Sequence, residues 1–306
     1  MTIAPERAGA SAPAVPADLI GWFEPGTPEW HAARAHGIGG SEIAAVLGLS
    51  PHESPFSLWH RKAGRIGPVE ESEEMYWGKV HEPAICARFA ALHPDLTVVP
   101  SPTYAAVGRP WHIVNPDRLA ITADGSVEVV EAKTSRDGIG WGDEGTDQIP
   151  VHYKAQVRWY CAALAARRAH VAVLIAGSEY REYIVEHDPA DEALMLDRAQ
   201  AFMDSLAAGT PPPIDGHTAT YQVVKALPDG VEDVDVEIPG PLRDRYFTAL
   251  DACKAAEEEK RAASGLVLAA IGNGRRATCL GEHVATRTAR NGRTHSLQPA
   301  RTRSNP

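Results

Sequence analysis

The chain has 306 residues and a formal net charge of −10, with 44% hydrophobic and 23% charged residues. This composition is ordinary for a soluble globular protein, and the length suits one large domain with an appendage or two smaller domains. No stretch approaches the roughly 20 apolar residues that span a bilayer, so we expect no membrane partner. The four cysteines form no CxxC pair, which argues against zinc ribbons, thiol redox chemistry and a cysteine-ligated iron–sulfur cluster.

The two ends of the chain differ in charge. Residues 1–20 combine proline with acidic residues, where a secretory signal would need a basic flank and an apolar run. We therefore predict a disordered lead-in and a cytoplasmic protein. From Ile271 to the end, seven arginines oppose one glutamate. A basic segment on an acidic body is compatible with DNA binding, and a solvated, disordered terminus is the alternative for the last ten residues or so.

Helices dominate the first third of the chain. The sequence predicts a helix over residues 30–35, then a glycine turn and a short helix from about Ser41 that ends at Gly48. Residues 54–66 and 70–94 place apolar side chains at helical spacing and predict two further helices.

Strand signals follow. Short β-branched stretches at residues 96–107, 111–122 and 126–135 predict strands, with the Ala123–Gly125 stretch as a hairpin turn. Residues 150–169 then predict a helix. These features indicate a mixed α/β sheet.

Two more strands are predicted, at residues 170–177 and 179–188. The alternation of strand, helix and strand is typical of an α/β protein with a mixed central sheet flanked by helices. An amphipathic helix over residues 189–209 precedes the proline-rich boundary TPPPIDG. The predicted core therefore covers residues 21–215.

The rest of the chain is predicted as an appendage. We expect an acidic linker over residues 216–240, and a final segment, 241–306, made of a charged helix, a small hairpin and a basic tail.

Asp117, Glu131 and Lys133 surround the predicted hairpin turn in NPDRLAITADGSVEVVEAKTS. We expect Asp117 late in one strand and Glu131 in the return strand, which brings both carboxylates to one edge of the sheet. Two anions held close repel, and a divalent cation relieves that repulsion. Oxygen ligands favour Mg²⁺, or else Mn²⁺. Lys133 shares the face of Glu131, where its ammonium is suited to activating a water or neutralising a phosphate under attack. Solvated charges on an ordinary hairpin are the alternative.

Five motifs follow one another along the chain, and their order is more specific than any one of them: ARAHGIGGSEIAAVLG, MYWGKVHEPAI, NPDRL, VEVVEAKTS and VHYKAQVRWYCAAL. Together they resemble the YqaJ-like viral recombinase family, which includes the phage alkaline exonucleases of the lambda exonuclease type. The likeness spans about residues 30–209. It implies a restriction-endonuclease-like PD-(D/E)xK core and Mg²⁺-dependent hydrolysis of linear double-stranded DNA, 5′ to 3′, that exposes 3′ single strands for recombination.

The resemblance also implies roles for the hairpin residues. Asp117 and Glu131 match the two carboxylate metal ligands, the main-chain carbonyl of Ala132 would complete the protein's share of the coordination, and Lys133 matches the catalytic lysine. Glu82 resembles the helix glutamate that assists at the metal site through water. An ordinary surface glutamate is the alternative for Glu82.

Further residues match DNA contacts of the family. Gln156 and Tyr160 are spaced to lie on one helix face and resemble a Q-x-x-x-Y pair whose amide positions the scissile strand; packing against the sheet is the alternative. Arg34 and Ser41 match the pair of residues that holds the terminal 5′-phosphate in the family. A guanidinium group binds phosphate through two parallel hydrogen bonds. Ser41 as an ordinary N-cap is the alternative. Arg118 stands where the family often has glycine, and it either contacts DNA or covers the strand edge.

The leading hypothesis is thus a Mg²⁺-dependent exonuclease acting on double-stranded DNA ends in the cytoplasm of a bacterial host. The resemblance further implies a single-strand annealing protein as a partner and a homotrimeric ring around DNA. Two alternatives stay open: another PD-(D/E)xK nuclease, either Cas4-like, RecB-like or an endonuclease, and a non-catalytic scaffold that binds DNA ends.

Overall fold

The computed structural model describes residues 13–23 and 26–300. Contacts divide the chain into two compact units, Met1–Asp229 and Gly230–Pro306. Among the described residues, no helix is long and apolar enough to cross a membrane.

The first unit contains the following helices and strands, in chain order: β1 (Ala17–Gly21), α1 (Pro28–Ala35), α2 (Gly40–Val46), α3 (Pro55–Lys62), α4 (Glu73–Leu92), β2 (Thr97–Pro100), β3 (Thr103–Ala106), β4 (Arg109–Val114), β5 (Arg118–Ile121), β6 (Val127–Ser135), α5 (Val151–Leu164), β7 (Arg168–Ile175), β8 (Glu179–Glu186), α6 (Pro189–Ala207) and α7 (Thr218–Ala226). The second unit contains α8 (Gly240–Ala270), β9 (Arg276–Cys279), β10 (Glu282–Arg290) and β11 (Arg293–Pro299).

The central sheet of the first unit has five strands in the order β2-β5-β6-β7-β8. β6 and β7 run parallel and are joined through α5, whereas the other neighbours pair antiparallel. A second sheet, β1-β3-β4, is antiparallel. The architecture confirms the predicted α/β class with a mixed central sheet flanked by helices.

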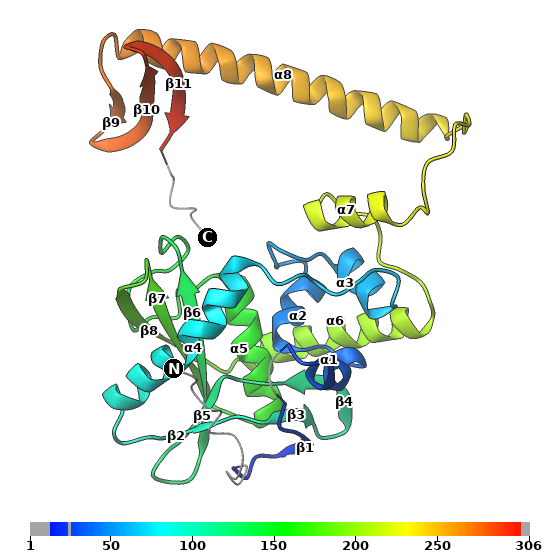
Figure 1. The fold of residues 1–306 in the computed structure, drawn as a ribbon, viewed down its shortest axis with the longest axis vertical. Helices are drawn as coiled ribbons and strands as arrows, with labels where there is room; N and C mark the ends of the chain where they lie inside the picture. Colours follow the sequence, from blue (N-terminus) through cyan, green and yellow to red (C-terminus); the bar gives the residue numbers. More distant parts are fainter. Residues whose placement is uncertain (1–12, 24–25, 301–306) are drawn as a thin grey trace. The chain divides into compact units, whose positions relative to one another are not determined.

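Alternation along β5 and β6 assigns the two faces of this sheet to different helices. Leu119 and Val129 are cross-strand partners in the main core, which also contains Val157 of α5. Ala120 and Val130 instead pack with Phe89 of α4. Helices α4 and α5 therefore cover opposite faces (Figure 1).

Proline residues break two of the predicted strands. Residues 96–107 form β2 and β3, and residues 111–122 form β4 and β5, with the members of each pair in different sheets. Pro102 and Pro116 stand in the breaks, where a residue without an N–H cannot extend a ladder. As a consequence, Asp117 lies immediately before β5 and not late in a single long strand.

Regular structure also extends beyond the predicted core. Residues 1–12 of the expected lead-in lie outside the described residues, but β1 begins at Ala17 and pairs with β3. Within the expected linker, α7 packs on α3, and the Thr220 hydroxyl donates to Ser54 Oγ at 2.6 Å.

The final segment holds a three-stranded sheet, β11-β10-β9, where a hairpin was predicted. Residues 301–306 of the basic tail lie outside the described residues.

Candidate active site on the β5–β6 hairpin

The β5–β6 hairpin places Asp117 beside the middle of β6. Arg118 pairs with Val130 in the antiparallel register, so the preceding residue, Asp117, reaches the level of Glu131. Asp117 Oδ2 accepts a hydrogen bond from the Ala132 N–H at 2.8 Å. The aspartate is thus fixed by the strand that carries the second carboxylate.

The two carboxylate oxygens of Glu131 have different environments. Glu131 is 2% exposed, and its Oε1 accepts hydrogen bonds from Lys133 Nζ and Gln156 Nε2, each at 2.6 Å. Its Oε2 is buried without a hydrogen-bond partner among the described residues. A buried acceptor without a partner costs free energy, so this oxygen is a suitable ligand for a cation.

The electrostatics of the hairpin favour a bound cation. Burial raises the pKa of Asp117 well above its usual range, and the charges of Glu131 and Glu82 raise it further. Burial also raises the pKa of Glu131, against the opposing effect of Lys133. For Lys133, burial opposes protonation, but Glu131 and Asp117 outweigh it and raise the pKa of the ammonium. One ammonium faces several carboxylates, and a divalent ion would relieve their remaining repulsion.

The donor set fits a hard divalent ion held by few protein ligands. Among residues 13–23 and 26–300, no three His, Cys, Asp or Glu side chains gather as a metal-binding group. Asp117 and Glu131 are oxygen ligands of the kind that Mg²⁺ and Mn²⁺ prefer, and Mg²⁺ usually keeps several waters. Ala132 lies between Glu131 and Lys133 on β6, and its N–H is the group bonded to Asp117.

Glu82 of α4 approaches the same hairpin but is engaged by Arg118. The Arg118 Nη1 donates to Glu82 Oε1 at 3.1 Å and to the main-chain oxygen of Asp117 at 2.5 Å. Arg118 is thereby tied to the α4 side of the sheet, with its side chain 18% exposed. Arg118 therefore links Glu82 of α4 to the main chain of Asp117.

Gln156 and Tyr160 of α5 line the other side of Glu131. Gln156 is 7% exposed and donates both to Glu131 Oε1 and, at 2.9 Å, to the Tyr160 hydroxyl. The Tyr160 ring lies against α2, because a Cβ added to Gly40 would come within 2.2 Å of Tyr160 Cε1. These contacts connect the carboxylate site to the GIGGS segment.

Arg34 and Ser41 meet at that segment. Arg34 Nη2 donates to Ser41 Oγ at 3.0 Å, and the guanidinium lies 4.2 Å from the centre of the Trp30 ring. The N-cap of α2 is Gly39, and Ser41 is the second residue of the helix. The alternative in which Ser41 serves as the N-cap is therefore wrong. The structure brings Arg34 and Ser41 together, as two ligands of one anion require.

A buried ion-pair network beneath this segment was not predicted. Glu42 Oε2 accepts the Gly39 N–H at 2.8 Å and pairs with Lys62 Nζ at 2.9 Å, while Glu42 Oε1 pairs with Arg61 at 3.2 Å. The signal in the sequence is a glutamate three residues after the N-cap, the spacing of a capping box. The network fixes the turn between α1, which carries Arg34, and α2, which carries Ser41.

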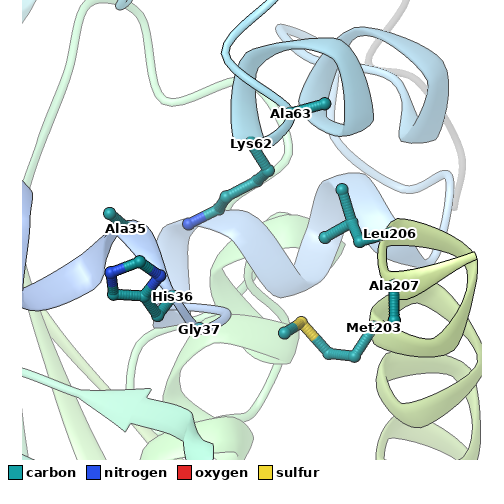
Figure 2. A pocket seen from close by; sticks show the side chains of 8 residues that line it. All are labelled: Ala35, His36, Gly37, Lys62, Ala63, Met203, Leu206 and Ala207. Atoms are coloured by element: carbon teal, nitrogen blue, oxygen red, sulfur yellow. The ribbon is translucent and has the colours of Figure 1, made fainter. Parts of the chain in front are cut away.

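A pocket of about 310 Å³ lies beside the network. Figure 2 shows Lys62 and His36 on one side of it and Met203 and Leu206 of α6 on the other. Lys62 also donates to the main-chain oxygen of Arg34 at 3.0 Å. The residues that follow Arg34, from Ala35 to Gly37, line the pocket together with Lys62.

Comparison with known proteins identifies the part of the chain that carries these residues. Residues 29–166 match the family model of the YqaJ-like viral recombinase domain. This segment is a YqaJ-like domain. It contains the candidate metal-binding and phosphate-binding residues, from Arg34 to Tyr160, and it excludes the second unit.

Relatives of the YqaJ-like domain occur in bacteria and viruses. The uncharacterized protein YqaJ of Bacillus subtilis (strain 168) is 31% identical over 211 residues, which cover 64% of this chain and 62% of that protein. Protein D345L of African swine fever virus (strain Badajoz 1971 Vero-adapted) is 29% identical over 126 residues, covering 40% of this chain and 36% of that protein. The chain thus spans less than two thirds of the length of these curated relatives.

The fold of the YqaJ-like domain is also that of a solved nuclease. The crystal structure of an alkaline exonuclease (LHK-Exo) from Laribacter hongkongensis superimposes with a TM-score of 0.51 at 20% identity, over 65% of this chain and 98% of that chain. The first unit therefore has the restriction-endonuclease-like fold that the sequence resemblance implied.

Proposed function

We propose that the protein is a metal-dependent deoxyribonuclease that degrades linear double-stranded DNA from its ends, 5′ to 3′, with Mg²⁺ or Mn²⁺. The observation that carries this proposal is the group formed by Asp117, Glu131 and Lys133, in which a buried Glu131 oxygen has no hydrogen-bond partner among the described residues. Support comes from the family of the domain and from the fold shared with a protein named an alkaline exonuclease.

Each hairpin residue has a role that follows from its contacts. Asp117 and Glu131 would hold the metal, with the main-chain carbonyl of Ala132 as a third protein ligand. When bound, the ion would supply Lewis-acid stabilisation of the phosphate and a more acidic water. The Lys133 ammonium, held 2.6 Å from Glu131 Oε1, orients the attacking water and stabilises charge that develops on the phosphate.

The remaining residues position the substrate. Gln156 supports Glu131 and directs its amide into the same site, and Tyr160 fixes that amide. Arg34 and Ser41 would bind the terminal 5′-phosphate, because guanidinium forms parallel hydrogen bonds with phosphate oxygens. Glu82 would assist through water once DNA or metal displaces Arg118. A single-strand annealing partner and a homotrimeric ring are proposals that follow from the family.

The decisive experiment is digestion of linear duplexes labelled at one 3′ end, with either a 5′-phosphate or a 5′-hydroxyl on that strand. With Mg²⁺ we expect the label to remain on progressively shorter fragments, and the 5′-phosphate substrate to be cut faster. Immediate release of labelled mononucleotide would reverse the proposed polarity.

Circular DNA separates the alternatives. Cleavage of covalently closed circles would favour an endonuclease. Binding of linear ends without degradation, at every Mg²⁺ and Mn²⁺ concentration, would favour a non-catalytic scaffold and contradict the proposal.

A further inference from the structure

We infer that the three-stranded sheet of the second unit binds the phosphate backbone of duplex DNA and forms a contact separate from the hairpin site. The inference extends the proposed function, on which it rests for the identity of the polyanion. It concerns β9, β10 and β11, which lie outside the YqaJ-like domain.

The sheet concentrates positive charge on a chain whose formal net charge is −10. Residues 271–300 contain a single carboxylate, Glu282, and five arginines: Arg275, Arg276, Arg287, Arg290 and Arg293. Among the described residues, none of these arginines forms an ion pair with a carboxylate, whereas arginines of the first unit repeatedly do. Arg287 is used internally, since its Nη2 donates to the main-chain oxygen of Leu268 in α8 at 3.2 Å.

The tip of the β10–β11 hairpin forces two arginines together. Asn291 and Gly292 both have positive φ, 53° and 72°, as a two-residue type I′ turn requires. This turn makes Arg290 and Arg293 direct cross-strand partners. Like charges opposite each other destabilise a sheet. A bound anion would remove that repulsion, and guanidinium groups bind phosphate through paired hydrogen bonds.

The tip is also hollowed and polar. Arg290 and Arg293 line a depression together with Asn291, Thr294 and His295. All five are exposed. The depression therefore presents donors to an anion without a carboxylate among its lining residues.

The sheet face that continues from the tip has the same character. Arg287 contacts α8, so alternation along β10 turns Thr286 and Thr288 to the opposite face. Their cross-strand partners on β11 are Gln298 and Ser296, and the Thr288 and Ser296 hydroxyls lie 2.8 Å apart. Hydroxyl and amide side chains are common phosphate contacts.

Arg276 adds a guanidinium to this face. It is the cross-strand partner of Thr286 on β9 and is exposed. The face therefore combines hydroxyl, amide and guanidinium groups, from β9 across to β11.

A nucleic acid suits this surface better than an acidic protein does. Residues 271–300 contain no Phe, Tyr or Trp, whereas protein interfaces depend on buried aromatic anchors. Duplex DNA instead presents one charge about every 1.7 Å of helix axis. A polar and basic face suits such a continuous row of charge.

The test measures binding by the full chain to a short duplex closed at both ends by hairpin loops, in EDTA, so that neither DNA ends nor cleavage contribute. The variant replaces three arginines, Arg276→Gln, Arg290→Gln and Arg293→Gln. Its control replaces three exposed arginines of α8, Arg243→Gln, Arg245→Gln and Arg261→Gln. Fluorescence anisotropy over a series of salt concentrations gives the affinity and its salt dependence.

We expect the sheet variant to bind at least tenfold more weakly and to lose about 2 to 3 units of the slope of log K against log salt, because each lost phosphate contact removes about 0.9. The α8 control should lose less than one unit. Equal slopes for the two variants would overturn the inference, and would leave an acidic protein as the ligand of the sheet.

The proposed function is tested apart from this result. If the wild-type chain binds the closed duplex through the sheet but degrades no linear DNA, the proposed nuclease activity is refuted and the proposed DNA-binding surface stands. If the chain degrades linear DNA but the sheet variant binds the closed duplex with the salt dependence of the wild type, only the proposed DNA-binding surface is refuted.

Discussion

Glu131 is the residue on which the site depends. Its Oε1 holds Lys133 and Gln156, and its Oε2 is buried without a hydrogen-bond partner among the described residues. One carboxylate therefore organises the protein donors and offers its second oxygen to a cation. Such an arrangement is costly without an ion, so it indicates function more than stability.

Lys133→Ala tests the assignment of the ammonium. We expect the initial rate of duplex degradation to fall by about 10² to 10³, the usual cost of removing one preorganised donor, while DNA-end binding stays nearly unchanged. Lys154→Ala is a matched control, because Lys154 of α5 forms an ion pair with the exposed Asp147, which precedes the helix. An undiminished rate in the Lys133 variant would show that another group stabilises the phosphate.

Glu42 predicts how the first unit responds to acid. Burial disfavours its charge, but Lys62, Arg34, Arg61 and the Gly39 N–H outweigh burial and hold the pKa of Glu42 at about 2, below its ordinary 4.5. A lowered pKa in the folded state stabilises the protein above the unfolded pKa. That contribution, about 3 kcal/mol, is lost as the pH falls from about 4.5 towards 2.

Glu42→Gln should therefore lower the free energy of unfolding near pH 7 by about 3 kcal/mol and flatten its decline between pH 4.5 and pH 2. Tryptophan fluorescence during urea denaturation reports on the first unit alone, because all seven tryptophans precede Asp229. Glu70→Gln, an exposed loop position, should leave both quantities unchanged. A parallel decline of the Glu42 variant and the wild type with pH would refute the role of the network.

At the scale of elements, α5 joins the two halves of the candidate site. It covers one face of the central sheet, supplies Gln156 to Glu131, and presses the Tyr160 ring against Gly40 at the start of α2. The helices α2, α5 and α6 pack against one another (Figure 1). The separation between the carboxylates and the Arg34 pair is thereby fixed by helix packing.

Gly40→Ala should disturb that packing. The added methyl group would meet Tyr160 Cε1 at 2.2 Å, and overpacking of this kind costs about 1 to 3 kcal/mol. We expect a lower Tm. We also expect a smaller preference for 5′-phosphate over 5′-hydroxyl ends, because Arg34 and Ser41 would move relative to the metal-binding carboxylates of the hairpin.

The control for this substitution is Gly67→Ala, where an added methyl group meets nothing within 4 Å. A double variant, Gly40→Ala with Tyr160→Leu, should recover part of the Tm. A Gly40 variant with an unchanged end preference would show that α2 and α5 are not coupled in this way.

The sequence predicted helices better than strands, for a local reason. Ser, Thr and Asp caps mark the starts of α1, α3, α4 and α6, and a cap acts within one turn of its helix. The division of residues 96–122 between two sheets depended instead on distant partners, such as β1 for β3 and β5 for β2. Strand pairing is non-local, so the breaks at Pro102 and Pro116 were missed.

At the scale of the whole molecule, the chain consists of two units with different charge and composition. The YqaJ-like domain lies within Met1–Asp229, and the arginine-rich sheet lies within Gly230–Pro306. We propose that the first unit hydrolyses the phosphodiester bond and that the second unit binds duplex DNA without sequence specificity.

The sequence by itself determined the α/β class, the family of the domain and the close approach of Asp117 to β6, because motif order and a short hairpin are local properties of the chain. The tertiary structure decided that Arg118 engages Glu82 and that Glu131 keeps one oxygen without a partner among the described residues. These outcomes depend on side chains from α4, α5 and the central sheet that meet only after packing, where burial and neighbouring charge set the cost of each group.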